Sequence, residues 1–234
     1  PNINAATARV LDNLGISLIK AERAGCCGAV AFHLNAQQEG LDYMRSNIDA
    51  WWSWVEREKV EAIVVTASGC GVTVKEYGHL LRHDPIYAEK AAKISALAKD
   101  ISEILHTELE NIERLMNIRN ANTDKTKLSF HSPCTLQHGI KIRGVVEKIL
   151  VAAGFDLAIV PNGHLCCGSA GTYSILQPEL SQQLLKNKVV ALESGKPDQI
   201  ATANIGCLMH LQGGTATSVK HWIELLDERL TYCE

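Results

Sequence analysis

The chain has 234 residues, of which 46% are hydrophobic and 5% aromatic, and its formal net charge is −3. This length and hydrophobic fraction are sufficient for one large core or for two cores of ordinary size. The slight negative charge and the scattered Lys and Arg residues argue against a nucleic-acid partner, and no apolar run approaches the roughly 18–20 residues of a membrane-spanning helix.

The first half of the chain is predicted to alternate helices with strands. Helices are expected over residues 5–14 and 41–58, and a short strand is expected over residues 16–19. The run over residues 61–66, Glu-Ala-Ile-Val-Val-Thr, is largely apolar and β-branched, which is typical of a buried parallel strand. This run ends shortly before Cys70, and another helix is expected to follow.

The middle of the chain, residues 86–116, carries apolar residues at helical spacing. This pattern predicts one long or two shorter amphipathic helices whose apolar stripe faces a core, and a helix that docks a partner is the alternative. Residues 120–125 are polar and predict a linker between the two halves.

The second half of the chain is predicted to repeat the alternation of the first half. Its expected elements are strands at residues 127–131, 155–160 and 198–203, and helices at residues 145–153 and 179–192. Alternating strands and helices predict an α/β fold in which parallel sheets are flanked by helices.

A cysteine motif occurs twice and indicates an internal duplication. Cys26-Cys27-Gly28 recurs in the second half as Cys166-Cys167-Gly168, and Gly69-Cys70 recurs at nearly the same offset as Gly206-Cys207. Similar offsets at separate landmarks are the signature of a repeat. We therefore expect two pseudo-symmetric lobes, residues 1–120 and 127–234, with the cysteines at the carboxyl ends of the strands.

The second lobe has one cysteine that the first lacks. This residue is Cys134, in His131-Ser132-Pro133-Cys134, and its counterpart in the first lobe would fall upstream of Pro1. The chain also begins without methionine. We therefore expect it to be a fragment whose first lobe has lost a ligand.

The paired cysteines point to a metal site. Adjacent cysteines cannot easily bond to each other, because the ring through their shared peptide is strained, but they can direct two thiolates at one metal. Eight cysteines are too sparse for a disulfide scaffold, which favours a protein of the reducing cytoplasm. Strand ends and helix N-termini stabilise thiolates. The candidate ligands are Cys134, Cys166, Cys167 and Cys207 in the second site and Cys26, Cys27 and Cys70 in the first.

The identity of the metal is less sharply determined by the residues. Four thiolates suit zinc or a [4Fe–4S] cluster, and the absence of compact Cys-x-x-Cys pairs favours the cluster, with zinc as its substitute. His131, His138 and His164 flank the second site and are expected to be capping or surface residues, with a hydrogen bond to the cluster as the alternative. Cys233 lies outside the repeat and is expected to be an incidental thiol.

The cysteine spacing resembles a known family. The order and spacing of Cys134, the adjacent pair Cys166-Cys167 and then Cys207 are similar to the cysteine-rich CCG domain of heterodisulfide reductases and related iron–sulfur proteins. Further stretches of sequence, including residues 66–81, resemble the glycolate oxidase (glycolate dehydrogenase) iron–sulfur subunits. The resemblance covers essentially the whole chain and corresponds to the C-terminal part of those subunits.

The resemblance implies a function in electron transfer without a catalytic residue in this chain. The [4Fe–4S] cluster would relay electrons from a flavin-containing dehydrogenase subunit, which oxidises a 2-hydroxy acid, towards the quinone pool. The implied location is the cytoplasm, or the inner face of the cytoplasmic membrane as a peripheral protein held there by partners. The alternatives are a metal-binding docking module without redox turnover and a thiol–disulfide reductase like the heterodisulfide enzymes.

One departure from the heterodisulfide reductases favours the relay over the reductase. In those enzymes each motif ends in Cys-x-x-Cys, and the additional thiolate supports disulfide chemistry. Ala67 and Asn204 occupy the corresponding positions here.

Overall fold

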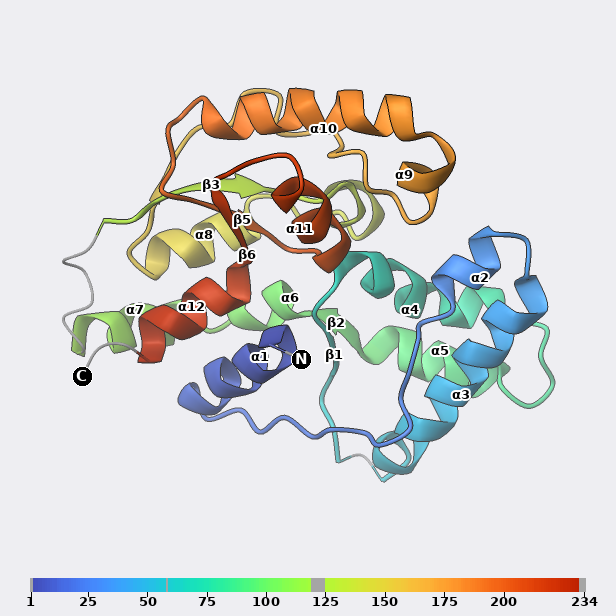
Figure 1. Cartoon of the computed structure of the whole chain (residues 1–234). Coiled ribbons are helices and arrows are strands. Elements are labelled where there is room, and N and C mark those ends of the chain that lie inside the picture. Colours follow the sequence, from blue (N-terminus) through green and yellow to red (C-terminus); the bar gives the residue numbers. More distant parts are fainter. Residues whose placement is uncertain (1, 58, 119–124, 232–234) are drawn as a thin grey trace. The chain divides into compact units, whose positions relative to one another are not determined.

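The computed structural model of the chain describes residues 2–57, 59–118 and 125–231 (Figure 1). The chain divides into two compact units, one formed by Ile19–Asp100 and the other by Pro1–Leu18 together with Ile101–Glu234. Cys233 and most of the predicted linker lie outside the described residues. In the part that is described, no helix is both long and apolar enough to cross a bilayer.

The unit of residues 19–100 is a small α/β layer. Its elements are α2 (Ala29–His33), α3 (Gln37–Val55), β1 (Ile63–Val65), α4 (Ser68–Leu80), α5 (Ala88–Leu97) and β2 (Ala98–Asp100). The two strands pair in parallel, with Ile63 opposite Ala98. Met44 and Ile48 from α3 pack with Tyr77 from α4 in its core. Cys27 belongs to the same buried cluster, so the first cysteine pair is anchored in the core.

The other unit contains a four-stranded parallel sheet in the order β4-β3-β5-β6. Figure 1 shows α10 on one side of this sheet and α8 and α12 on the other. Its strands are β3 (Lys127–His131), β4 (Asp156–Leu157), β5 (Gln199–Thr202) and β6 (Ser218–His221). Its helical segments are α1 (Asn2–Asn13), α6 (Ile101–His106), α7 (Leu109–Ile118), η2 (Thr135–Gly139), α8 (Val145–Ala152), α9 (Tyr173–Leu176), α10 (Pro178–Glu193), α11 (Ile205–Gln212) and α12 (Trp222–Thr231).

These elements confirm the predicted α/β class with parallel sheets flanked by helices. The strand predicted at residues 127–131 is found with those bounds, and α10 begins where Pro178 and Glu179 favour a helix N-terminus. The strand predicted at residues 155–160 is shorter, because only Asp156–Leu157 pairs with β3.

The strand predicted at residues 16–19 is wrong. This segment has no regular structure, and Leu18 and Ile19 are 41% and 44% exposed. A β-branched apolar run forms a strand only when a neighbouring strand satisfies its backbone groups, and in the described chain no strand pairs with this segment.

The middle of the chain differs from the prediction of one long or two shorter helices, because it contains α5, β2, α6 and α7. Strand β2 separates α5 from α6 and pairs with β1. Ile94, Ala98, Ile101 and Leu105 are all buried, so the apolar spacing runs through the strand at intervals that also fit a helix. Three strand residues are too few for their alternation to be recognised in such a pattern.

The repeat in the sequence reappears in the order of the elements. By their order along the chain, α1 corresponds to α8, β1 to β5, α4 to α11, β2 to β6 and α6 to α12, with α5 as an additional helix in the first half. The paired strands β1 and β2 match the paired strands β5 and β6, and both pairs are parallel.

The helices at the outer ends of each repeat are exchanged, which means that each of them packs against a helix from the other half of the sequence. Helix α1 packs against α12, and α6 packs against α8. Because α1 corresponds to α8 and α6 to α12, each of the two contacts joins one helix from each half of the sequence. Arg9 of α1 closes the first contact with a bidentate ion pair to Asp227 of α12, at 2.5 Å from Nη2 to Oδ2. The exchange explains why the compact units do not coincide with the predicted lobes 1–120 and 127–234, whose division remains a prediction.

Candidate metal centre

The cysteines of the second site lie at the carboxyl ends of adjacent strands. Cys134 comes shortly after β3, and Cys207 lies in the first turn of α11, directly after β5. The Cys166-Cys167 pair lies in the loop between β4 and α9. Because β3 and β5 are neighbours in the sheet, their ends bring these separate segments together.

Hydrogen bonds between thiols connect all four residues of this site. Cys134 is bonded to Cys166, Cys166 to Cys167, and Cys167 to Cys207. The backbone N–H of Gly168 also donates to the Cys166 sulfur at 3.3 Å. Every cysteine in the described residues is a free thiol. The structure therefore brings together the four side chains that the sequence selected, and metal binding by them remains a proposal.

The thiol network favours negative charge at this site. The hydrogen bond from Cys134 lowers the pKa of Cys166 to about 2, and the hydrogen bond from Cys167 lowers the pKa of Cys207 to about 5. The same bonds raise the pKa of Cys134 and Cys167, because these residues donate to thiolates. Two thiolates at neutral pH make the site a binding place for a cation or a cationic metal core.

A buried histidine faces the same thiols. His131 is the last residue of β3 and is 1% exposed. Its ring lies within 4.8 Å of the sulfurs of Cys167 and Cys207. A hydrogen bond with the His131 side chain also helps to lower the pKa of Cys207, so the imidazole is directed at this thiol. Of the three histidines that flank the motif, His138 and His164 are exposed, so His131 alone has the position of a ligand or hydrogen-bond donor.

The first site repeats this arrangement with three cysteines. Cys70 lies in the first turn of α4, directly after β1, and its hydrogen bond with Cys27 lowers the pKa of Cys27 to about 6. Cys26 is also bonded to Cys27. The buried side chain of Asn47 holds this loop by donating to the Cys26 carbonyl at 2.7 Å and accepting from the Gly25 N–H at 2.8 Å.

The glycine of each Cys-Cys-Gly motif touches a helix backbone. Gly28 and Gly168 have φ values of +84° and +95°. A Cβ atom on Gly28 would lie 2.4 Å from the carbonyl oxygen of Gly40 in α3, and one on Gly168 would lie 2.5 Å from that of Ser181 in α10. Both loops therefore need glycine for the same two reasons, positive φ and close approach.

Gly168→Ala tests this contact. We expect it to lower the free energy of unfolding by roughly 2–4 kcal/mol, because positive φ and a backbone clash add. Gly171→Ala is the matched control, since Gly171 has φ +59° with nothing within 4 Å of its Cβ position; its expected loss is about 1 kcal/mol. Urea unfolding followed by circular dichroism measures both, and equal losses would show that the helix contact is unimportant.

Two residues near the sites were not selected from the sequence. Asn47 and Lys188 are 1% and 2% exposed, on α3 and α10 respectively. A lysine or asparagine in a helix is usually a solvated residue. The signal that could have found Lys188 is its spacing, because Ser181, Leu185 and Leu192 form the buried stripe of α10 and Lys188 lies on that stripe.

Comparison with known proteins agrees with the arrangement of the cysteines. The model of the cysteine-rich domain called CCG matches residues 1–75 and 128–212, which cover both sites and more than half of the chain. The chain belongs to the cysteine-rich domain family. The two matched segments show that the family's domain is present here as a pair.

Several known proteins are similar to this one along nearly the whole chain. The glycolate oxidase iron-sulfur subunit of Escherichia coli (strain K12) is 57% identical over 98% of this chain and 54% of its own length. The probable glycolate oxidase iron-sulfur subunit of Bacillus subtilis (strain 168) is 30% identical over 90% of this chain and 46% of its own length. Lactate utilization protein A of Bacillus licheniformis is 27% identical over 97% of this chain and 93% of its own length. The chain thus spans about half the length of the two glycolate oxidase subunits.

Proposed function

We propose that the chain is an iron–sulfur electron-transfer component of a glycolate oxidase-type complex. The observation that carries this proposal is the convergence of four free thiols, Cys134, Cys166, Cys167 and Cys207, from three separate segments of the chain. Their donor set fits an iron–sulfur cluster, which would supply one-electron acceptance and donation. The resemblance assigns no catalytic residue to the chain. In this proposal the role of the chain is to hold the cluster and to separate it from solvent.

We propose a [4Fe–4S] cluster in the second centre, with zinc as a substitute when iron is lost. Four thiolates meet the ligand requirement of a [4Fe–4S] cluster. His131 adds a buried imidazole that lies within 4.8 Å of the sulfurs of Cys167 and Cys207, so the centre has a further donor that can ligate or hydrogen-bond to it.

The helix caps support electron relay rather than disulfide reduction. Asn204, at one position where the heterodisulfide enzymes have an additional cysteine, caps α11 by accepting from the Gly206 N–H at 2.9 Å. Ala67 has the corresponding position before α4. A capping amide and a methyl group replace the additional thiols, so disulfide chemistry lacks the sulfur that it needs.

The proposed partners follow from the family. Two of the relatives are named as iron-sulfur subunits of glycolate oxidase, and a subunit implies other polypeptides in the same assembly. We propose a flavin-containing dehydrogenase subunit as electron donor and the quinone pool as final acceptor. The proposed location is the cytoplasm, or the inner face of the cytoplasmic membrane through these partners.

Anaerobic purification followed by metal analysis and EPR tests the proposal. We expect iron and acid-labile sulfide in the protein and a cluster signal that changes when dithionite is added. Stoichiometric zinc without a reducible signal in the anaerobic protein would instead support a docking module. A cluster signal that changes when a substrate thiol is added would support a thiol–disulfide reductase.

A further inference from the structure

Lys188 is a buried lysine whose ammonium binds a loop of the second site. It is 2% exposed on α10, and its ammonium donates to the carbonyl oxygen of Gly163 at 2.8 Å. Among the described residues it forms no ion pair with Asp or Glu. Burial of an ammonium without opposite charge costs several kcal/mol, so its retention here needs a compensating anion.

Cysteines of the second centre act electrostatically on Lys188. Burial lowers the pKa of Lys188, whereas the charges of Cys167, Cys166 and Cys207 act in the opposite direction. The Gly163 carbonyl that Lys188 binds lies in the loop leading to Cys166 and Cys167, and the Gln137 side chain also reaches it, at 3.5 Å. The Lys188 ammonium therefore binds the loop that leads to Cys166 and Cys167, and the charge of the centre acts on it.

The first centre has a neutral residue at the equivalent position. The carbonyls of Gly40 and Ser181 contact the two motif glycines. The step in sequence from Gly40 to Asn47 is the same as the step from Ser181 to Lys188. Asn47 is also buried and also holds its cysteine loop, by hydrogen bonds to the backbone. The two helices thus present an ammonium to one centre and an amide to the other.

We propose that Lys188 is a positioning residue that raises the reduction potential of the second centre through its fixed positive charge, while Asn47 leaves the first centre without this charge. The inference rests on the proposed iron–sulfur function. Reduction adds one electron and hence one negative charge to the centre, and a cation in a low-dielectric surrounding stabilises the more negative state. The electron comes from the reduced flavin of the partner subunit, and the step transfers no proton to the protein.

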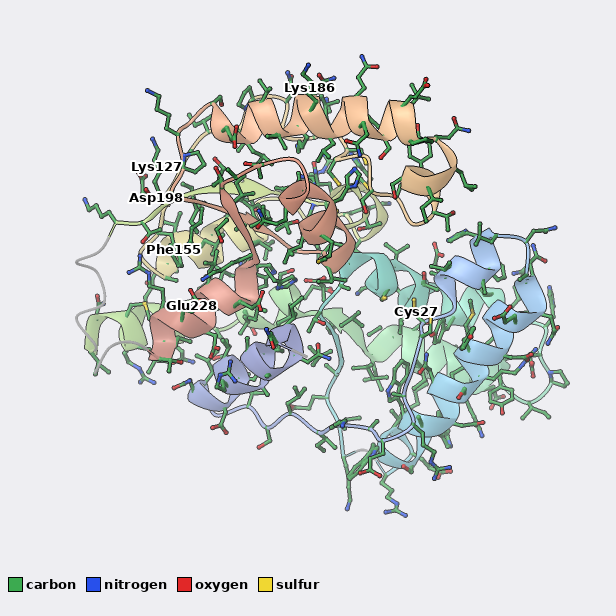
Figure 2. All side chains as sticks on the ribbon, in the orientation of Figure 1. Cys27, Lys127, Phe155, Lys186, Asp198 and Glu228 are labelled. Atoms are coloured by element: carbon green, nitrogen blue, oxygen red, sulfur yellow. The ribbon has the colours of Figure 1, made fainter. Side chains whose placement is uncertain are left out.

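The test compares neutral substitutions on the same helix. Lys188→Gln removes the buried charge, and Lys186→Gln makes the same change at an exposed position that Figure 2 shows on the outer side of α10. The whole protein is purified anaerobically and titrated with dithionite and mediators while EPR follows the clusters. We expect Lys188→Gln to shift the potential of one centre to more negative values with unchanged iron content, and Lys186→Gln to have no effect.

Lys188→Arg keeps the test decisive if the glutamine variant fails to hold iron. Arginine retains the charge but not the shape of lysine, so this variant should keep the potential of the unsubstituted protein. An iron-replete Lys188→Arg protein with a more negative potential, or an iron-replete Lys188→Gln protein with an unchanged one, would overturn the inference. An unsubstituted protein without any reducible cluster would instead overturn the proposed function on which the inference rests.

Discussion

Cys167→Ser is expected to abolish metal incorporation in the second centre and to lower the melting temperature of the chain by roughly 5–10 °C. Cys167 is 1% exposed and connects Cys166 to Cys207 through its thiol. A serine hydroxyl is a weak ligand for iron or zinc and leaves a buried polar group beside the remaining thiols. Because the ligands come from segments that only the fold assembles, metal binding is also folding free energy.

The controls separate metal loss from loss of packing. Unsubstituted protein stripped of metal by a chelator should melt close to metal-free Cys167→Ser, since both lack the same linkage energy. Cys233→Ser, at the position predicted to be an incidental thiol, should change neither metal content nor melting temperature. Full metal content together with unchanged stability in Cys167→Ser would show that the four-thiolate assignment is wrong.

The second large effect is the inequality of the two centres in this chain. The second centre offers Cys134, Cys166, Cys167 and Cys207 with His131 nearby, whereas the first offers Cys26, Cys27 and Cys70. Loss of one ligand should weaken metal binding by at least roughly 100-fold, since even the loss of outer hydrogen-bond partners costs about 10- to 100-fold.

A chelator titration measures this inequality. Metal bound per chain should fall in two phases as the chelator concentration rises, with the first centre emptied before the second. Cys207→Ser should remove the tighter phase and Cys70→Ser the weaker one, which assigns each phase to its site. A single phase, with both centres emptied together, would contradict the idea that the first lobe lacks a ligand.

The convergence of the cysteines was predictable from the sequence because of where they lie along the chain. A largely apolar, β-branched run such as residues 61–66 identifies a strand, which is half-buried and covers Ile63–Val65 in the structure, and Cys70 follows it after a few residues. The same holds for Cys134 after β3 and Cys207 after β5. Parallel strands place their carboxyl ends at one edge of a sheet, so local order in the sequence becomes proximity in space.

The features that the sequence did not predict depend on contacts with distant residues. Strand β2 forms because β1 lies beside it, and residues 16–19 remain irregular where no paired strand is described. Lys188 is buried where its ammonium donates to a loop carbonyl from another segment of the chain. Neither hydrophobic spacing nor residue type records such neighbours, so these features appeared only in the structure.

The exchanged helices give the duplication a physical origin. A pairing of α1 with α12 and of α8 with α6 is the contact that a two-fold symmetric dimer of a single repeat would make with itself. Joining both copies in one polypeptide keeps this interface in a fixed one-to-one ratio without any need for association. It also frees the two copies from having identical residues, so that a single protein can carry Lys188 at one centre and Asn47 at the other.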